Sequence, residues 1–115
     1  MDPLLTGQLS IIIPACNEAQ GLSVFLKALK SAFPQEQIIV VNDGSTDITA
    51  QIAQACEVEV ISHPYKIGNG AAIKSGARHA NRDILVTMDA DGQHQVKDLQ
   101  RLLDAYRQGY DMVVG

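Results

Sequence analysis

Short apolar runs rich in β-branched residues alternate with segments of helical spacing along this chain of 115 residues. The runs predict strands over 9–14, 37–41, 58–62, 83–88 and 111–114, and the spacing predicts helices over 21–33, 46–56, 69–81 and 96–107. Strands that are apolar throughout and separated by helices are typical of a parallel sheet covered on both faces. Because crossovers between parallel strands are right-handed, the sequence predicts an α/β fold with a Rossmann-like, doubly wound, mostly parallel sheet.

Composition indicates a compact globular protein and excludes one class of partner. Hydrophobic residues make up 46% of the chain and charged residues 19%, which suits a single domain. We assign residues 9–115 to this domain and residues 1–8 to an N-terminal extension. The formal net charge is −4 and the Lys and Arg residues are scattered, so we expect no nucleic-acid partner.

The cysteines and the absence of long apolar segments predict the cellular location of the protein. Cys16 and Cys56 have neither the spacing of a metal knuckle nor the density of a disulfide scaffold, which favours reduced thiols. No signal-like leader opens the chain, and no apolar run approaches the roughly 20 residues that span a bilayer. We therefore expect a soluble, cytoplasmic chain. The run at 111–114 stops where a further connection would begin, so we also expect truncation at the C-terminus.

The strand predicted at 83–88 runs directly into two carboxylates, Asp89 and Asp91, in a loop that contains a glycine. Hard cations such as Mg²⁺ and Mn²⁺ prefer oxygen ligands and leave coordination places for substrate phosphates. The pair therefore indicates a metal-bound diphosphate, with a solvated acidic turn as the alternative for so short a motif. Gln93 offers an amide oxygen as a third ligand, whereas we assign His94 to a polar loop.

Polar clusters also follow the first two predicted strands, so three clusters meet at the carboxyl edge of one sheet, where open α/β sheets bind ligands. In the first cluster, Pro14 is expected to end its strand, and Glu18 either caps the next helix or bonds a base or a ribose hydroxyl. In the second cluster, residues 42–47, a tight Asp-Gly turn and a Ser or Thr helix cap explain Gly44, Ser45 and Thr46 but not Asp43. A carboxylate there is suited to accept an N–H from a nucleotide base.

A glycine-rich loop and a helix of small residues occupy residues 63–76. Glycines before a helix N-terminus resemble a phosphate cradle, but the dinucleotide fingerprint and the Gly-Lys-Ser/Thr end of a P-loop are both absent. We assign the glycines to close helix–sheet packing and expect Lys66 or Lys74 to approach phosphates. His63 and His79 show no partner pattern, and no Ser/His/Asp or Cys/His set at a recognisable spacing predicts covalent catalysis.

Four segments taken in this order resemble family 2 glycosyltransferases: Pro-x-x-Asn-Glu at 14–18, Asn-Asp-Gly-Ser-Thr-Asp at 42–47, Gly-Asn-Gly-Ala-Ala at 68–72 and Asp-Ala-Asp-Gly-Gln-His at 89–94. The resemblance is nearest to the branch that transfers mannose or glucose to dolichyl or other polyprenyl phosphates, and it spans the chain from Leu9 onward. It implies that the chain is the nucleotide-binding half of a GT-A fold.

The resemblance also implies roles for single residues. The residues it places around the nucleotide sugar are Pro14, Cys16, Glu18, Val41, Asp43, Asp89 and Ala90, with Asp43 reading the base. Asp91 and Gln93, together with Asp89, would bind Mg²⁺ or Mn²⁺, and Asp89 and Asp91 would be the catalytic pair. The implied reaction transfers a hexose, with inversion, from a GDP-mannose or UDP-glucose type of sugar donor to an acceptor such as polyprenyl phosphate. The metal would stabilise the departing diphosphate.

Two other functions stay open on the sequence. A nucleotidyltransferase would cleave between the phosphates of a nucleoside triphosphate, but residues 14–18 contain neither the Gly nor the Lys of its usual loop. A non-catalytic nucleotide-binding or assembly module would bind a nucleoside diphosphate without releasing sugar, and truncation favours it. An interrupted sheet also exposes an edge strand, from which we expect a homodimer. We expect the full-length protein to act peripherally at the cytoplasmic face of a membrane.

Overall fold

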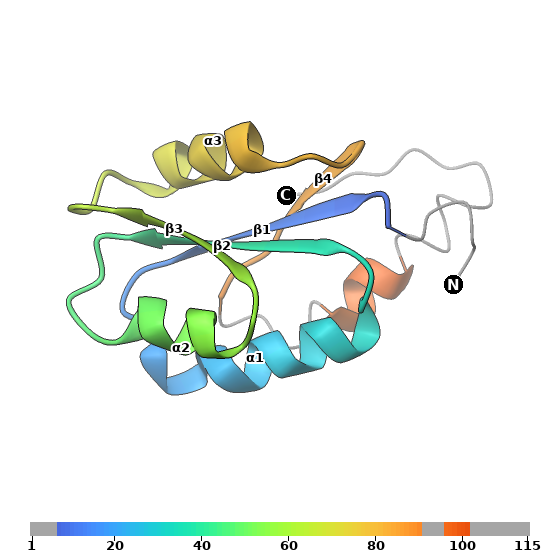
Figure 1. Ribbon diagram of the computed structural model, residues 1–115, viewed down its shortest axis with the longest axis horizontal. Helices are drawn as coiled ribbons and strands as arrows, with labels where there is room; N and C mark the ends of the chain where they lie inside the picture. Colours follow the sequence, from blue (N-terminus) through green and yellow to red (C-terminus); the bar gives the residue numbers. More distant parts are fainter. Residues whose placement is uncertain (1–6, 91–95, 102–115) are drawn as a thin grey trace.

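The computed structural model describes residues 7–90 and 96–101, in which strands and helices alternate (Figure 1). The elements are β1 (Leu9–Ala15), α1 (Ala19–Ala32), β2 (Gln37–Asp43), α2 (Thr49–Ala55), β3 (Glu59–His63), α3 (Asn69–His79) and β4 (Ile84–Thr87). Residues 96–101 are also helical. The strand expected at 111–114 and the rest of the helix expected at 96–107 lie outside the described residues. Within residues 7–90 and 96–101, no helix combines the length and the apolar character that crossing a membrane requires.

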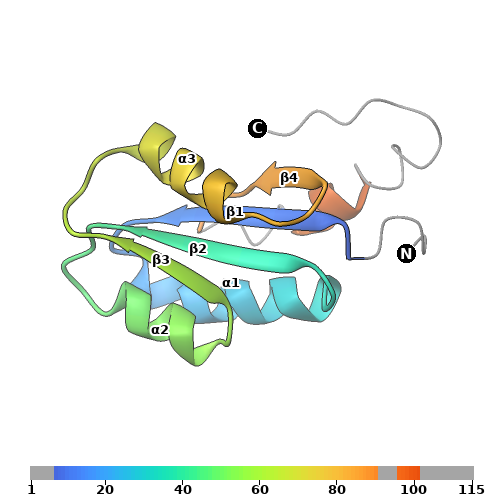
Figure 2. The same cartoon turned by 45° about the horizontal axis from the view of Figure 1, so that its top comes forward.

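The four strands run parallel in one sheet with the order β3-β2-β1-β4. The chain steps outward from β1 to β2 and β3, and it then returns past β1 to add β4 on the other side. Because each crossover is right-handed, the return requires a helix on the opposite face. Accordingly, α1 and α2 cover one face and α3 covers the other (Figures 1 and 2). The expected α/β class and doubly wound parallel sheet are confirmed.

The side chains of β1 alternate between two hydrophobic layers. Ile11 and Ile13 pack on the α1 side with Phe25, whereas Ile12 packs on the α3 side with Ala72. The larger layer also contains Leu22, Leu26 and Leu29 of α1 and Val96 and Leu99 of the last helical stretch. Full burial of one such side chain contributes roughly 1.5–3 kcal/mol, and β1, like β2, contributes side chains to both layers.

β1 passes through Pro14 and ends at Ala15, so the expectation that Pro14 ends its strand is wrong. The Ile12 carbonyl accepts a hydrogen bond from Met88 N at 3.0 Å, on the β4 side of β1. Main-chain groups in a strand alternate sides, so the Pro14 nitrogen faces that side too. Pairing with β4 ends at Thr87. The missing N–H of proline therefore removes no bond from the sheet.

α2 begins at Thr49 rather than at residue 46, because the residues expected to cap it bond the β1–α1 loop instead. Ser45 Oγ accepts from Asn17 N at 2.9 Å, and Thr46 N donates to Asn17 Oδ1 at 2.8 Å. Ile48 takes the N-cap position, and the carboxylate of Asp47 before it accepts from Thr49 N at 2.9 Å. A contact that is distant in sequence thus outweighs the local capping preference of Ser and Thr.

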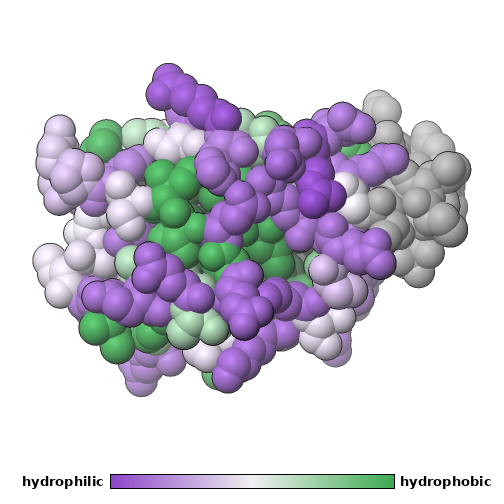
Figure 3. All heavy atoms as spheres, in the orientation of Figure 1, coloured by the Kyte–Doolittle hydropathy of each residue, from purple (hydrophilic) through white to green (hydrophobic). Residues whose placement is uncertain are grey.

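β3 forms one outer edge of the described sheet, and hydrophobic surface gathers over it between α3 and α2 (Figure 3). Val60 and Ile61 of this strand are only partly buried. An open strand edge is able to pair with another chain. The homodimer expected from the sequence stays a prediction.

One glycine of α3 has the packing role that the sequence predicted for the glycines of this segment. A Cβ added at Gly76 would lie only 2.5 Å from Ile12 Cγ2, so the absence of a side chain brings α3 close to the sheet. A Cβ added at Gly68 or Gly70 would meet no heavy atom within 4 Å. The packing explanation is therefore confirmed for Gly76 alone among these three.

We expect Gly76→Ala to lower the free energy of unfolding by about 1–3 kcal/mol, because the new methyl group overpacks the contact with Ile12. Gly21→Ala in α1 is the matched control: a Cβ there meets nothing within 4 Å, and alanine favours a helix by up to ~1 kcal/mol. Urea denaturation followed by circular dichroism measures both. Equal stability of the two variants would contradict the close approach.

Candidate functional site

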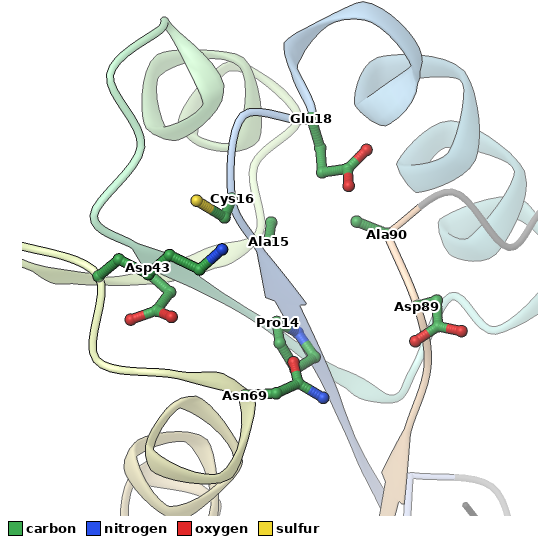
Figure 4. Close-up of a pocket in the computed structure, with 9 residues that line it drawn as sticks. Pro14, Ala15, Cys16, Glu18, Asp43, Asn69, Asp89 and Ala90 are labelled. Carbon is green, nitrogen blue, oxygen red and sulfur yellow. The ribbon is translucent and has the colours of Figure 1, made fainter.

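A cavity of about 410 Å³ opens at the carboxyl ends of the strands, and four segments that are distant in sequence line it (Figure 4). The lining residues are Pro14, Ala15, Cys16 and Glu18 from the end of β1 and the loop after it, Asp43 from β2, Lys66 and Asn69 from the β3–α3 region, and Asp89 and Ala90 from the end of β4. β1 and β4 flank the point where the strand order reverses. Open α/β sheets bind their ligands at this point, so the cavity lies where the topology favours a site.

Most residues predicted to surround a nucleotide sugar line this one cavity. Val41 differs, because it is fully buried in the α3-side layer beside Ile39. Ala15 and Asn69 also line the cavity, at the end of β1 and the start of α3. Both lie within segments that carry the resemblance, 14–18 and 68–72, but neither was assigned a role from the sequence.

The metal prediction falls largely outside the described residues. Asp91 and Gln93 belong to the undescribed segment 91–95, whereas Asp89 lies on the cavity wall. Within residues 7–90 and 96–101, no group of three or more His, Cys, Asp or Glu side chains is placed to hold a metal ion. The ligand set therefore stays a prediction.

Asp43 is buried at the end of β2, and its carboxylate accepts three hydrogen bonds from the β3–α3 region. Oδ1 accepts from His63 Nδ1 and from Ile67 N, each at 2.9 Å, and Oδ2 accepts from Gly68 N at 2.9 Å. Burial raises the pKa of Asp43, but the hydrogen bonds from Ile67, His63 and Gly68 together hold it below the usual value for an aspartate. Asp43 therefore has a structural role, anchoring this loop, that the sequence did not indicate.

Gly44 lets the same loop approach the end of β2. Its φ is +69°, and a Cβ added to it would lie 2.2 Å from Lys66 N and 2.3 Å from the Tyr65 carbonyl carbon. Both the left-handed backbone and the close approach require glycine here. The Asp-Gly turn expected from the sequence thus also seats the loop that brings Lys66 and Asn69 to the cavity.

Hydrogen bonds from main-chain N–H groups to side-chain oxygens join the segments after β1 and β2, which border the cavity. Besides the Asn17 bonds to Ser45 and Thr46, Glu18 N donates to Thr49 Oγ1 at 3.0 Å. The Thr49 hydroxyl and backbone N–H also bond Asp47 and lower the pKa of its carboxyl group. Glu18 occupies the N-cap position of α1 without a side-chain capping bond. The capping alternative for the Glu18 carboxylate therefore finds no support.

Both histidines in the described residues have partners that the sequence did not predict. His63 bonds Asp43 through Nδ1 and Ser75 Oγ through Nε2 at 2.8 Å, and His79 Nε2 lies 2.7 Å from Glu59 Oε1. Asp43 and His63 pair directly in the register of β2 and β3. The contact between Asp43 and His63 could have been predicted only from this register, which a single sequence does not reveal.

The sequence model of Glycosyl transferase family 2 matches residues 10–115 of the chain. This chain belongs to glycosyl transferase family 2. It is 38% identical to the polyprenol monophosphomannose synthase of Mycolicibacterium smegmatis, an alignment that covers 96% of this chain and 45% of the relative. It is 39% identical to the undecaprenyl-phosphate mannosyltransferase of Micrococcus luteus, and this alignment covers 90% of this chain and 46% of the relative.

Among solved structures, the glycosyltransferase chain is similar to glucosyl-3-phosphoglycerate synthase from Mycobacterium tuberculosis in complex with Mn²⁺, UDP and glucosyl-3-phosphoglycerate. The TM-score is 0.65 at 26% identity, and the match covers 72% of this chain and 33% of the other. The chain spans less than half the length of each of these three proteins. The resemblance to family 2 and the GT-A type of fold are confirmed, and the nucleotidyltransferase alternative loses its support.

The lowered pKa of Asp43 predicts a pH-dependent stability. The ionised carboxylate stabilises the folded state at pH values above its unfolded pKa of ~4, and this stabilisation is lost as the pH falls through the lower folded pKa. We expect Asp43→Asn to cost about 1–3 kcal/mol of unfolding free energy near neutral pH, because buried donors lose their partner. The difference in unfolding free energy between the wild type and Asp43→Asn should become smaller below about pH 4.

Urea denaturation across roughly pH 3 to 7 measures this effect. Asp98→Asn is the control, because Asp98 is exposed and pairs with Arg101 at 3.5 Å on the same helical stretch; such surface pairs contribute about 0–1 kcal/mol. A cost of Asp43→Asn that stays constant with pH would contradict the assignment.

Proposed function

We propose that residues 9–115 form the sugar-donor-binding domain of a glycosyltransferase that transfers a hexose from a nucleoside-diphosphate sugar to polyprenyl phosphate. The observation that carries the proposal is the convergence of Glu18, Asp43 and Asp89 on one cavity at the switch point of a family 2 chain. Two relatives are named for polyprenol or undecaprenyl phosphate and mannose, which favours a mannose donor. Because this acceptor is a lipid, we propose that the full-length protein acts as a peripheral protein at the cytoplasmic face of a membrane.

The cavity suggests an orientation for the sugar donor. Asp43 and Cys16 lie on one side of it and Asp89 and Ala90 on the other, with Pro14 between them (Figure 4). A carboxylate accepts about four hydrogen bonds, and three on Asp43 come from the protein. The bonds from the described residues thus leave one acceptor position on Oδ2 for a base N–H. We place the nucleoside at Asp43 and Cys16 and the sugar diphosphate at Asp89 and Ala90.

The oxygen ligands at the β4 end fit a hard divalent cation. Asp89 brings a carboxylate to the cavity wall, and Asp91 and Gln93 follow within four residues. We propose that these three residues bind Mg²⁺ or Mn²⁺, which agrees with the Mn²⁺ and UDP in the solved relative. The ion would neutralise charge on the departing diphosphate.

The proposed reaction is an inverting displacement that needs no general base. A phosphate oxygen of the acceptor, already negative, forms the new bond to the anomeric carbon on the face opposite the diphosphate. The bond from that carbon to the diphosphate breaks, and its electron pair leaves with the nucleoside diphosphate. The chain's own residues hold the nucleoside at Asp43 and the diphosphate near Asp89, which fixes the anomeric carbon for attack.

The proposal predicts nucleotide binding that depends on the metal. We expect the full-length protein to bind either GDP or UDP, more tightly with Mn²⁺ present, and Asp91→Asn to weaken the metal-dependent binding at least about tenfold through the loss of a ligand. Calorimetric titration measures the affinities, with Asp98→Asn as a surface control of the same chemistry. If neither nucleotide binds, or if Asp91→Asn binds like the wild type, the proposed site is wrong. Hexose transfer to polyprenyl phosphate separates an enzyme from a binding module.

A second prediction uses the two cysteines, both of which are partly exposed. Cys16 lines the cavity, whereas Cys56 follows α2 and packs against the core. We expect bound nucleotide to slow alkylation of Cys16 several-fold, because the ligand covers the thiol, and to leave Cys56 unchanged. Peptide mapping by mass spectrometry measures the two rates separately. Equal protection of both thiols would indicate a global change instead of occupancy of the cavity.

A further inference from the structure

His63 connects the candidate base-reading carboxylate to α3. Its ring is largely buried, with the side chain 10% exposed. Nδ1 lies 2.9 Å from Asp43 Oδ1 and Nε2 lies 2.8 Å from Ser75 Oγ. Because a carboxylate only accepts, Nδ1 is the donor to Asp43. A continuous chain of hydrogen bonds therefore runs from Ser75 on α3 through His63 to Asp43.

This chain of bonds restricts the orientation of the Asp43 carboxylate. The last torsion of an aspartate side chain is broad and roughly two-fold, so the carboxylate plane needs external contacts to fix it. His63 and Ile67 occupy both acceptor positions of Oδ1, and Gly68 occupies one position of Oδ2. The remaining acceptor position on Oδ2 consequently has a defined direction.

The Ser–His–Asp order resembles the hydrogen-bond chain of a covalent catalyst, but its placement differs. Ser75 is not among the residues that line the cavity, whereas Asp43 is. The hydrogen-bond chain thus reaches the cavity with the carboxylate of Asp43 and not with the hydroxyl of Ser75. The arrangement is suited to orient an acceptor instead of activating a nucleophile.

We propose that His63, supported by Ser75, is a positioning residue that sets base selectivity through Asp43. This inference rests on the proposed function, in which Asp43 faces the base. Uracil and guanine present a ring N–H on their pairing edge, whereas cytosine and adenine present a ring nitrogen that only accepts. A carboxylate in a fixed orientation accepts a hydrogen bond from the ring N–H of uracil or guanine. It disfavours cytosine and adenine, because their ring nitrogen and the carboxylate oxygen are both acceptors and no proton lies between them.

The test compares two nucleotides that differ at this ring position. The full-length protein is titrated with UDP and CDP if it binds UDP, or with GDP and ADP if it binds GDP, in the presence of Mn²⁺. We expect His63→Ala to reduce the affinity ratio within the pair about tenfold, which is the effect of losing one charge-assisted bond. His63→Asn retains an N–H near Nδ1 and should restore much of the ratio. Ser75→Ala should give an intermediate ratio.

His79→Ala is the matched control. His79 also pairs with a carboxylate, Glu59, but both are about half exposed. Glu59 begins β3 and His63 ends it, so this second pair lies at the opposite end of the strand from the site. We expect His79→Ala to keep the ratio of the wild type.

The outcomes separate the inference from the proposed function. If His63→Ala weakens both nucleotides equally, or keeps the wild-type ratio, His63 has no part in selectivity and the inference is overturned. If Asp43→Asn abolishes selectivity while His63→Ala retains it, the proposed function stands without the inference. A wild-type protein that binds neither UDP nor GDP overturns both. Thermal melting identifies a variant that does not fold, and Ser75→Ala then carries the test in place of His63→Ala.

Discussion

A buried carboxylate at the end of β2 organises this end of the molecule. Burying an ionised group is costly unless hydrogen bonds replace its hydration, and Asp43 obtains those bonds from His63, Ile67 and Gly68. All three donors lie between the end of β3 and the start of α3. If the loop moved away from the end of β2, the buried carboxylate of Asp43 would therefore lose its hydrogen-bond donors. The position of Lys66 at the cavity follows from that one requirement.

The topology explains why these loops surround a cavity instead of packing together. Right-handed crossovers place α1 and α2 on one face and α3 on the other, so the chain leaves β1 toward one face and enters β4 from the other. The strand order reverses between β1 and β4, and the cavity opens at this switch point. Bonds from Asn17 to Ser45 and Thr46 hold the adjoining loops together on the α1 side. Bonds between backbone N–H groups and side-chain oxygens thus hold this part of the cavity wall together within the protein itself, which reduces the ordering cost of binding.

The sequence predicted the sheet and the common location of the polar clusters, because both follow from apolar periodicity and from the rule that parallel strands end at one edge. It did not predict contacts that depend on strand register. His63 meets Asp43 because β2 and β3 align them, and Pro14 stays within β1 because β4 ends beside it. The late start of α2 has the same origin, since Ser45 and Thr46 bond a residue 28 or 29 positions away. Local preferences were outweighed wherever a distant partner was available.

In the proposed function, Asp43 adds base recognition to the loop anchoring that its hydrogen bonds show, and this combination limits what a substitution of Asp43 can reveal. Asparagine at this position would remove the charge, offer an N–H where Gly68 N donates, and change the acceptor that faces the cavity. Loop anchoring and base recognition would fail together, and the two contributions are not additive when residues share one hydrogen-bond network. The network provides a way to separate them, because His63 contacts Asp43 through its side chain and is itself bonded by Ser75, while Ile67 and Gly68 anchor the loop through main-chain groups. Changes at the histidine alter the orientation of the carboxylate and leave those main-chain bonds available. The division of donors around one carboxylate therefore makes its two roles experimentally separable.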